Sequence, residues 1–150
     1  MIVRKAELKD AEQIAKNNVL MAKESENQIL SSDTVLKGVK AMLSDETKGF
    51  YLVAVEKDVI LGQLMITFEW SDWRNQTIWW VQSVYIKEEY RKKGIFTQLL
   101  KEIKKIAEQN DISLFRLYVF NQNDKAIEVY KKLGWEKEPY LFFQKNIDSI

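Results

Sequence analysis

VYIKEEYRKKGIFTQLLKEIKKIAEQ, residues 84–109, is the stretch that decides the fold. It begins with a strand-like apolar segment, passes through the basic, glycine-containing turn at 90–96, and continues as an amphipathic helix. The apolar side chains of that helix lie on one face: Phe96, Leu99, Leu100, Ile103 and Ala107. A helix that begins after the Arg-Lys-Lys-Gly turn at 91–94 has unpaired backbone N–H groups and positive side chains at the same end. We therefore predict an anion site there.

Composition and charge favour a folded enzyme or binding protein with a small anionic ligand. The chain has 150 residues, 46% hydrophobic and 30% charged, which predicts one globular domain over residues 1–150. The net charge is only +1, yet residues 87–105 contain seven Lys or Arg against three Glu. This local excess suits a small anion better than a long polyanion. A nucleic-acid binder that uses the basic residues 91–93 is a less favoured interpretation, because this patch is small and the net charge is close to zero.

The chain contains no cysteine and no histidine. Disulfides, thiolate metal sites, Ser-His-Asp hydrolysis and most zinc chemistry are therefore excluded, and we expect no metal site. The N-terminal residues have no apolar signal core, and no apolar run is long enough for a membrane span. We predict a cytoplasmic protein that binds neither membrane nor nucleic acid.

Hydrophobic periodicity predicts the order β-α-α-β-β-β-α-β-α-β, an α/β domain with a mixed sheet. Asp10 and Gln13 resemble a capping box at the start of the first helix, and Ser32 or Asp33 precedes the second. The remaining expected elements are strands at 2–6, 50–70 (two strands with a Lys-Asp turn), 77–86, 113–120 and 140–146, and helices after the 91–94 turn and from Asn123 to Leu133.

A second cluster follows the expected strand at 113–120. Asn123, Ala126, Tyr130 and Gly134 are spaced by three, four and four residues. Asn123 is typical of an N-cap, and Ala126 and Tyr130 share one helical face. Taken singly, Asn123 is a plain cap and Tyr130 a core aromatic. Because this helix and the preceding one leave neighbouring strands, we expect both to begin at the same edge of the sheet.

These motifs together resemble the GNAT superfamily of acyl-CoA-dependent N-acetyltransferases. Residues 84–100 match the strand, R/Q-x-x-G-x-G/A turn and helix of that family, and residues 121–135 match its N-x-x-A-x-x-x-Y-x-x-x-G-F/W pattern. Residues 2–14 are similar to its first strand and helix, and residues 61–86 are loosely similar to the diamine acetyltransferase branch. The resemblance implies a single-domain fold with a mixed sheet of about six to seven strands and about four helices on both faces.

The resemblance also implies that the anion is the pyrophosphate of acetyl-CoA, the co-substrate. Backbone N–H groups of the turn and the first helical residues would wrap the phosphates: Arg91 at the start of the loop, then Lys92, Lys93, Gly94, Ile95, Phe96 and Thr97. The strand residues Val84, Tyr85 and Ile86 would pair with the pantetheine amides, and a backbone N–H there would polarise the thioester carbonyl. Asn123 would bind the pantetheine arm, and Tyr130 would protonate the leaving thiolate.

Two positions depart from the family pattern. Phe96 replaces a small residue of the turn, so we expect altered packing there rather than lost binding. Gln82 stands where many relatives have a glutamate base, and a glutamine cannot accept a proton. Three alternatives remain open: Gln82 orients a water, Glu69 is the base, or the amine arrives neutral.

Residues 68–80, FEWSDWRNQTIWW, contain four of the five tryptophans beside Glu69 and Asp72. This composition is equally typical of a twisted hairpin with aromatic cross-strand pairs and of a pocket for a cationic amine. The two interpretations are compatible.

The sequence thus predicts an acyl-CoA N-acetyltransferase that moves an acetyl group directly to a primary amine of a small molecule. No covalent enzyme intermediate is expected without a Cys or His nucleophile. The competing hypothesis is an inactive CoA-binding sensor or partner-binding module. The resemblance also implies a possible homodimer, which is common in this family.

Overall fold

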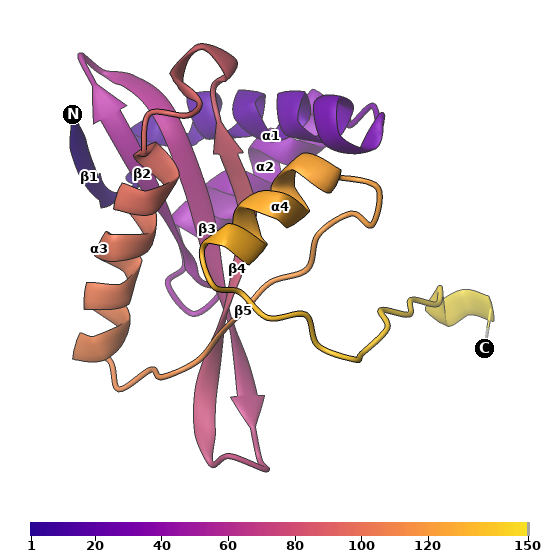
Figure 1. The fold of residues 1–150 in the computed structure, drawn as a ribbon. Helices are drawn as coiled ribbons and strands as arrows, with labels where there is room; N and C mark the ends of the chain where they lie inside the picture. The colour runs from indigo at the N-terminus through magenta and orange to yellow at the C-terminus, as the bar shows by residue number, and fades with distance from the viewer. Residues whose placement is uncertain (150) are drawn as a thin grey trace. The chain divides into compact units, whose positions relative to one another are not determined.

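The computed structural model describes residues 1–149, and Figure 1 shows the path of the chain. Its strands and helices are β1 (Ile2–Lys5), α1 (Ala11–Glu26), α2 (Ser32–Leu43), β2 (Phe50–Glu56), β3 (Val59–Ser71), β4 (Gln76–Ile86), α3 (Ile95–Gln109), β5 (Phe115–Arg116) and α4 (Asp124–Lys132). The chain divides into two compact units, the first covering Met1–Phe120 and the second beginning at Asn121. No helix among residues 1–149 is long and apolar enough to cross a bilayer.

A mixed sheet forms the centre of the first unit. Its strands lie in the order β1-β2-β3-β4-β5; the first four pair antiparallel, and β5 pairs parallel to β4. The mixed sheet and the four α-helices found within residues 1–149 confirm the predicted α/β fold class. The predicted number of strands is wrong, because the sheet has five strands rather than six or seven among the described residues.

Of the six strand segments expected from the sequence, one is missing and another is much shorter than predicted. The segment 113–120 pairs only through Phe115 and Arg116, and 140–146 forms no strand. The aromatic and aliphatic side chains of the latter segment are 73–85% exposed from Leu141 to Phe143. Strand propensity largely measures packing on a pleated, half-buried surface, so a strand-like sequence forms no strand where that surface is missing.

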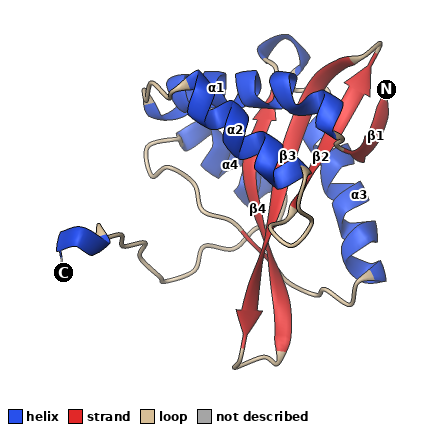
Figure 2. Cartoon of the chain, turned by 180° about the vertical axis from the view of Figure 1, so that it is seen from behind, coloured by secondary structure: helices blue, strands red, loops and turns tan. Residues whose placement is uncertain are grey.

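Helices cover both faces of the sheet (Figures 1 and 2). On one face, Ile14 of α1 and Val39 of α2 pack with Tyr51 and Val53 of β2 in one buried cluster. On the other, α3 contacts β1, β2 and β3. Because successive strand residues point to opposite faces, β2 supplies both layers of the core.

The start of α1 differs from the predicted capping box. The Asp10 carboxylate reaches back to the backbone N–H of Glu7 (2.7 Å) and accepts two hydrogen bonds from Arg4. The predicted pairing of Asp10 with Gln13 is therefore wrong. Gln13 instead accepts from the Ile60 backbone N–H and donates to the Asp58 carbonyl, which ties α1 to the β2–β3 turn.

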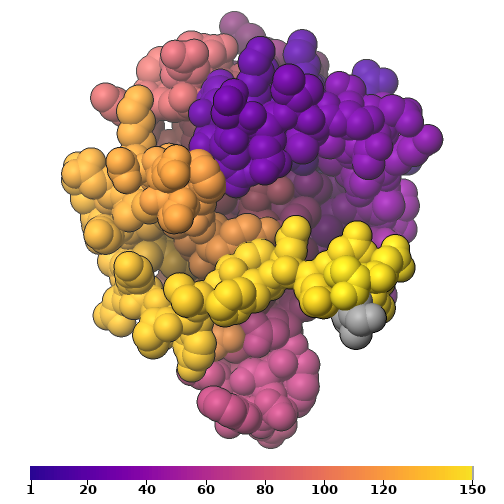
Figure 3. All heavy atoms as spheres, turned by 90° about the vertical axis from the view of Figure 1, so that its right-hand side faces the viewer, coloured from indigo at the N-terminus to yellow at the C-terminus, as the bar shows by residue number. Residues whose placement is uncertain are grey.

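The outer parts of β3 and β4 form a long hairpin that projects from the rest of the first unit, drawn in pink in Figure 3. Its turn includes Asn75 at φ 51°. Trp70 and Trp73, near the tip, are 63% and 88% exposed.

Candidate active site

A bulge interrupts β4 between its outer and inner halves. Gln63 of β3 pairs with Tyr85, whereas Met65 pairs with Gln82, so β4 contains one more residue than β3 in this interval. Ser83 lies in the bulge with φ 50°, a left-handed conformation that is uncommon for a residue other than glycine. Beyond the bulge lie the predicted pantetheine-binding residues 84–86.

The edge of β4 that faces β5 is paired over a short length. The two strands pair only through Trp79↔Phe115 and Trp80↔Arg116. Within residues 1–149, no strand continues this pairing along residues 84–86. An extended molecule with amide groups can add to such an edge as a further strand.

The basic turn leads into α3 through two left-handed residues. Lys92 has φ 62°, and Gly94, the N-cap of α3, has φ 79°. The first intrahelical bond runs from the Gln98 N–H to the Gly94 carbonyl, so the N–H groups of the first turn point out of the helix end. The side chains at 91–93 are exposed around this end. An anion bound at this helix end stays a prediction.

Gly94 is needed for its backbone conformation. A Cβ at this position would meet no atom within 4 Å, but φ 79° disfavours other residues. Gly62, in contrast, is needed because there is no space for a side chain. A Cβ there would lie 2.5 Å from Ile86 Cδ1 and 3.0 Å from Ile95 Cγ2. Gly62 therefore lets the start of α3 approach the sheet. Nothing in the sequence pattern distinguished this glycine.

Arg91 is hydrogen-bonded to protein groups, although its side chain is 42% exposed. Its Nε donates to the Ile86 carbonyl (2.9 Å), and its guanidinium donates to Glu24 of α1 (2.7 Å). The Tyr85 hydroxyl donates to the other Glu24 oxygen (3.1 Å). Burial and the adjacent Glu24 charge raise the pKa of Tyr85. Sequence reasoning missed Glu24, which lies 67 residues from Arg91.

Gln82, a candidate for orienting a water, and Glu69, the candidate base, are both hydrogen-bonded. Gln82 Nε2 donates to Thr67 (2.6 Å), and the Tyr118 hydroxyl donates to Gln82 Oε1 (3.4 Å). Glu69 accepts from Trp80 Nε1 (2.7 Å) and pairs with Arg116 (3.0 Å). The Trp80 and Arg116 hydrogen bonds lower the pKa of Glu69. A lowered pKa makes this carboxylate a weaker general base.

The aromatic hairpin has a clear structural organisation. Trp79 packs edge-on against Phe50 (5.4 Å between ring centroids) and near Phe68 (5.9 Å). Asp72 accepts from the Trp73 backbone N–H, as turn residues commonly do. These contacts support the interpretation of the hairpin as cross-strand aromatic packing. Glu69, Trp80 and Gln82 lie on one face of the sheet.

In the second unit, Asn123 caps α4 as predicted. Its side-chain oxygen accepts from the Ala126 backbone N–H (3.3 Å), and Gly134, at φ 87°, follows the end of the helix. The Tyr130 ring lies 6.1 Å from that of Trp135 in an edge-on arrangement. Burial raises the pKa of Tyr130, so its phenol stays protonated at neutral pH.

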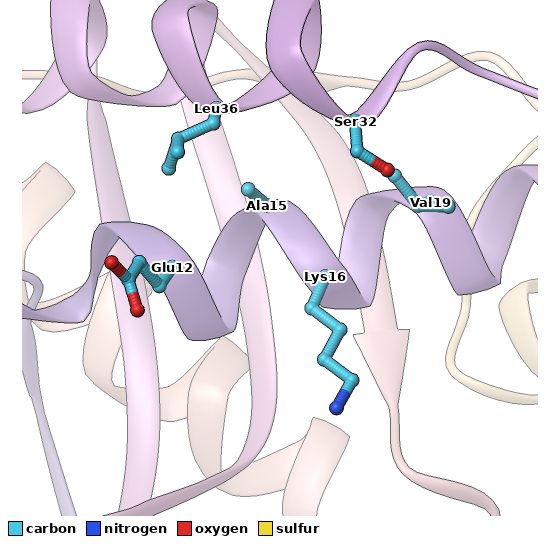
Figure 4. Close-up of a pocket in the computed structure, with 6 residues that line it drawn as sticks. All are labelled: Glu12, Ala15, Lys16, Val19, Ser32 and Leu36. Carbon is cyan, nitrogen blue, oxygen red and sulfur yellow. The ribbon is translucent and has the colours of Figure 1, made fainter.

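A hollow of about 190 Å³ lies between α1 and α2 (Figure 4). Its lining residues are Glu12, Ala15, Lys16, Val19, Ser32 and Leu36. None of these was predicted as a site residue. All six lie on α1 or α2, and none lies on β4 or α3, where the candidate site is predicted.

Three comparisons connect the chain to known proteins. The model of the acetyltransferase (GNAT) family matches residues 9–135. A thialysine N-epsilon-acetyltransferase of Sus scrofa is 35% identical over 75 residues, 50% of this chain and 44% of that protein. The chain spans about half the length of the curated relatives it matches.

Solved structures share the fold over nearly the whole chain. The structure of "a possible acetyltransferase from Clostridium difficile 630" is 42% identical, covers 97% of both chains and has a TM-score of 0.88. The structure of a "predicted acetyltransferase with acetyl-CoA" from Clostridium acetobutylicum, at 19% identity, covers 99% of this chain and 97% of that one, with a TM-score of 0.77. The latter likeness is one of fold alone.

Proposed function

Because the chain belongs to the acetyltransferase (GNAT) family, we propose that it transfers an acetyl group from acetyl-CoA directly to a primary amine of a small molecule. The observation that carries this proposal is the continuity of one backbone surface. The open edge of β4 at residues 84–86 leads, through the turn at 91–94, to the N-terminus of α3.

The two ends of that surface suit the two parts of the donor. Backbone N–H groups at the start of α3, with Lys92 and Lys93 beside them, favour a pyrophosphate. The edge at residues 84–86 offers backbone donors and acceptors to the amides of pantetheine. The structural neighbour from Clostridium acetobutylicum, solved with acetyl-CoA, supports the same donor.

The proposed chemistry needs no enzyme nucleophile. The amine nitrogen attacks the thioester carbonyl carbon, a backbone N–H near residue 84 stabilises the oxygen as it gains charge, and the C–S bond then breaks. Tyr130 gives its phenolic proton to the departing thiolate, and the proton of the amine leaves to water or to a base. The lowered pKa of Glu69 favours water held by Gln82, or an amine that arrives neutral, over direct proton transfer to Glu69.

The acceptor proposed is a small amine, in keeping with the thialysine named in the curated relatives. Glu69 and Asp72 would attract a cationic one, although Arg116 already neutralises part of the Glu69 charge. A single domain, a cytoplasmic location and a homodimer stay predictions of the sequence.

The direct test is a panel of amines, amino acids, aminoglycosides and peptides incubated with acetyl-CoA, with release of free thiol as the measurement. We expect turnover with at least one small primary amine. Acetylation of peptides alone would contradict the small-molecule acceptor, and binding of CoA without any turnover would favour the inactive module. The observation that favours this second candidate is that Gln82 cannot accept a proton and that its amide is hydrogen-bonded to Thr67 and Tyr118, while the pKa of the nearby Glu69 is lowered.

A further inference from the structure

A polar network is buried between α1 and the sheet of the first unit. Asn17 donates to Gln63 Oε1 (3.0 Å), Gln63 Nε2 donates to Asn18 Oδ1 (2.8 Å), and Asn18 donates to the Tyr51 hydroxyl (3.1 Å). All four side chains are at least 92% buried, and Gln63 is completely so. Polar groups in a core usually weaken it unless every one is satisfied. Here no buried side-chain polar atom among the described residues lacks a partner.

The network extends to the bulge of β4. Gln63 Nε2 lies 3.5 Å from the Ser83 carbonyl oxygen, and the Ser83 side chain lies close enough to the Tyr51 hydroxyl to oppose the rise in the pKa of Tyr51 that burial causes. Ser83 has φ 50°. A residue with a Cβ keeps a left-handed conformation only where its surroundings hold it. Gln63 and Tyr51 lie next to Ser83 on the α1 side and are placed to supply that restraint.

The bulge decides which way the inner half of β4 faces. Gln63 pairs with Tyr85, so both side chains point to the α1 face, where Tyr85 reaches Glu24. Ile86 points to the opposite face, toward Ile95 and the start of α3. Without the extra residue, the alternation of side chains would exchange these two positions. The backbone N–H groups of residues 84–86 would turn with them.

We propose that Gln63 is a positioning residue, which holds the bulge at Ser83 so that the backbone of residues 84–86 is aligned with the acyl donor. This inference rests on the proposed function, because the alignment matters only if the donor binds along β4. Gln63 acts through Ser83 and touches no reacting atom. Its role is to fix the N–H group that stabilises the oxygen of the transition state.

The first experiment replaces Gln63 with methionine, which keeps the length of the side chain and removes its hydrogen bonds. We expect kcat to fall by roughly ten- to 100-fold, as for a misplaced catalytic group, while the Kd of CoA changes by less than about threefold. Tyr51→Phe is the milder companion in case Gln63→Met does not fold, and it should lower kcat in the same direction. Ile66→Val, a buried change on the same strand away from the network, controls for lost stability.

Rescue separates positioning from general support of the fold. Glycine adopts positive φ without strain, so Ser83→Gly added to Gln63→Met should restore at least part of the lost kcat. Ser83→Gly alone is the reference for this comparison. If the kcat of Gln63→Met stays within twofold of wild type, or if it falls and Ser83→Gly restores none of it, the proposal is overturned.

Amide hydrogen exchange at residues 82–86 gives a readout that does not depend on turnover. Exchange there should accelerate in Gln63→Met by more than in Ile66→Val. Should the chain prove inactive toward every amine, faster exchange would still show that Gln63 holds the bulge, and only the proposed function would fall. Equal exchange in the two variants would overturn the positioning role even in an active enzyme.

Discussion

Arg91 donates to the carboxylate of Glu24 over 2.7 Å and thereby fastens the basic turn to the C-terminal part of α1. The same carboxylate accepts from Tyr85 at 3.1 Å. Glu24 thus binds Tyr85 at the end of β4 and Arg91 in the turn that precedes α3. Both members of the ion pair are about 40% exposed, so its contribution to global stability should be small.

Glu24→Gln should weaken CoA binding by about two- to fivefold, the equivalent of an exposed ion pair worth up to about 1 kcal/mol. Calorimetric titration with CoA measures the change. Glu26→Gln, on the same helix end, is the matched control and should bind normally. Tighter binding by Glu24→Gln would mean that Glu24 competes with phosphate for Arg91 rather than ordering the turn.

CoA should stabilise the fold. A ligand at 100 times its Kd adds about 2.7 kcal/mol when it binds only the folded state, which raises the melting temperature of a domain of this size by several degrees. Thermal unfolding monitored by circular dichroism tests this. Free adenine, which lacks the pyrophosphate, should have far less effect, and an unchanged curve with millimolar CoA would contradict the assigned donor site.

A negative charge introduced at position 94 should strongly reduce the affinity for CoA. Asp and Asn have nearly the same shape, so Gly94→Asp and Gly94→Asn should bring a similar strain to the left-handed conformation at φ 79°. Only Asp brings a negative charge next to the expected phosphates. We expect similar melting temperatures and a clearly higher CoA Kd for the Asp variant. Equal Kd values for the two variants would place the phosphates elsewhere.

Tyr130→Phe should separate chemistry from binding. The ring and its contact with Trp135 are kept, so the Kd of acetyl-CoA should be unchanged. Loss of the proton donor should lower kcat by about 10²- to 10⁴-fold. Because burial raises the pKa of Tyr130, the phenol stays a donor at neutral pH, and wild-type kcat should decline through loss of this donor only at strongly alkaline pH. Near-normal turnover in the Phe variant would leave the proton to water.

Acid stability should depend on Asp10. Burial would raise the pKa of its carboxyl, but hydrogen bonds from Arg4 and the Glu7 N–H outweigh burial and lower it. The stabilisation is therefore present at neutral pH and is lost as pH falls through the lowered pKa. Asp10→Asn should reduce the free energy of unfolding by about 1.5–3 kcal/mol at pH 7 and by much less near pH 2. Urea unfolding at both pH values measures this, with Asp111→Asn as a control that should change little.

Local patterns predicted much of the structure correctly. The Arg-Lys-Lys-Gly turn and the Asn123 cap carry short-range signals, because left-handed turns and helix caps demand particular residues. The same holds for the Lys57-Asp58 turn, whose two residues both have positive φ. Such features depend on a few neighbouring residues, and a single sequence displays them.

The features that the sequence did not reveal depend on distant contacts. Glu24 is one exposed glutamate among many until α1 brings it to Arg91. Gln63 interrupts an apolar strand, but only the packing of Asn17 and Asn18 above it explains why. The prediction of a strand at 140–146 was wrong, because an apolar pattern does not show whether a partner strand lies beside the segment.

The connections between β2, β3 and β4 are hairpins, whereas β1 and β5 join the sheet only after intervening helices. Hairpin closure loses little chain entropy, so these three strands should form the nucleus from which the rest of the first unit folds. Substitutions that weaken their pairing, such as Ile66→Val, should then slow refolding, whereas changes in β1 should mainly accelerate unfolding. The bulge at Ser83 lies inside this nucleus, and the binding edge of β4 would therefore take shape before α3 docks on the sheet.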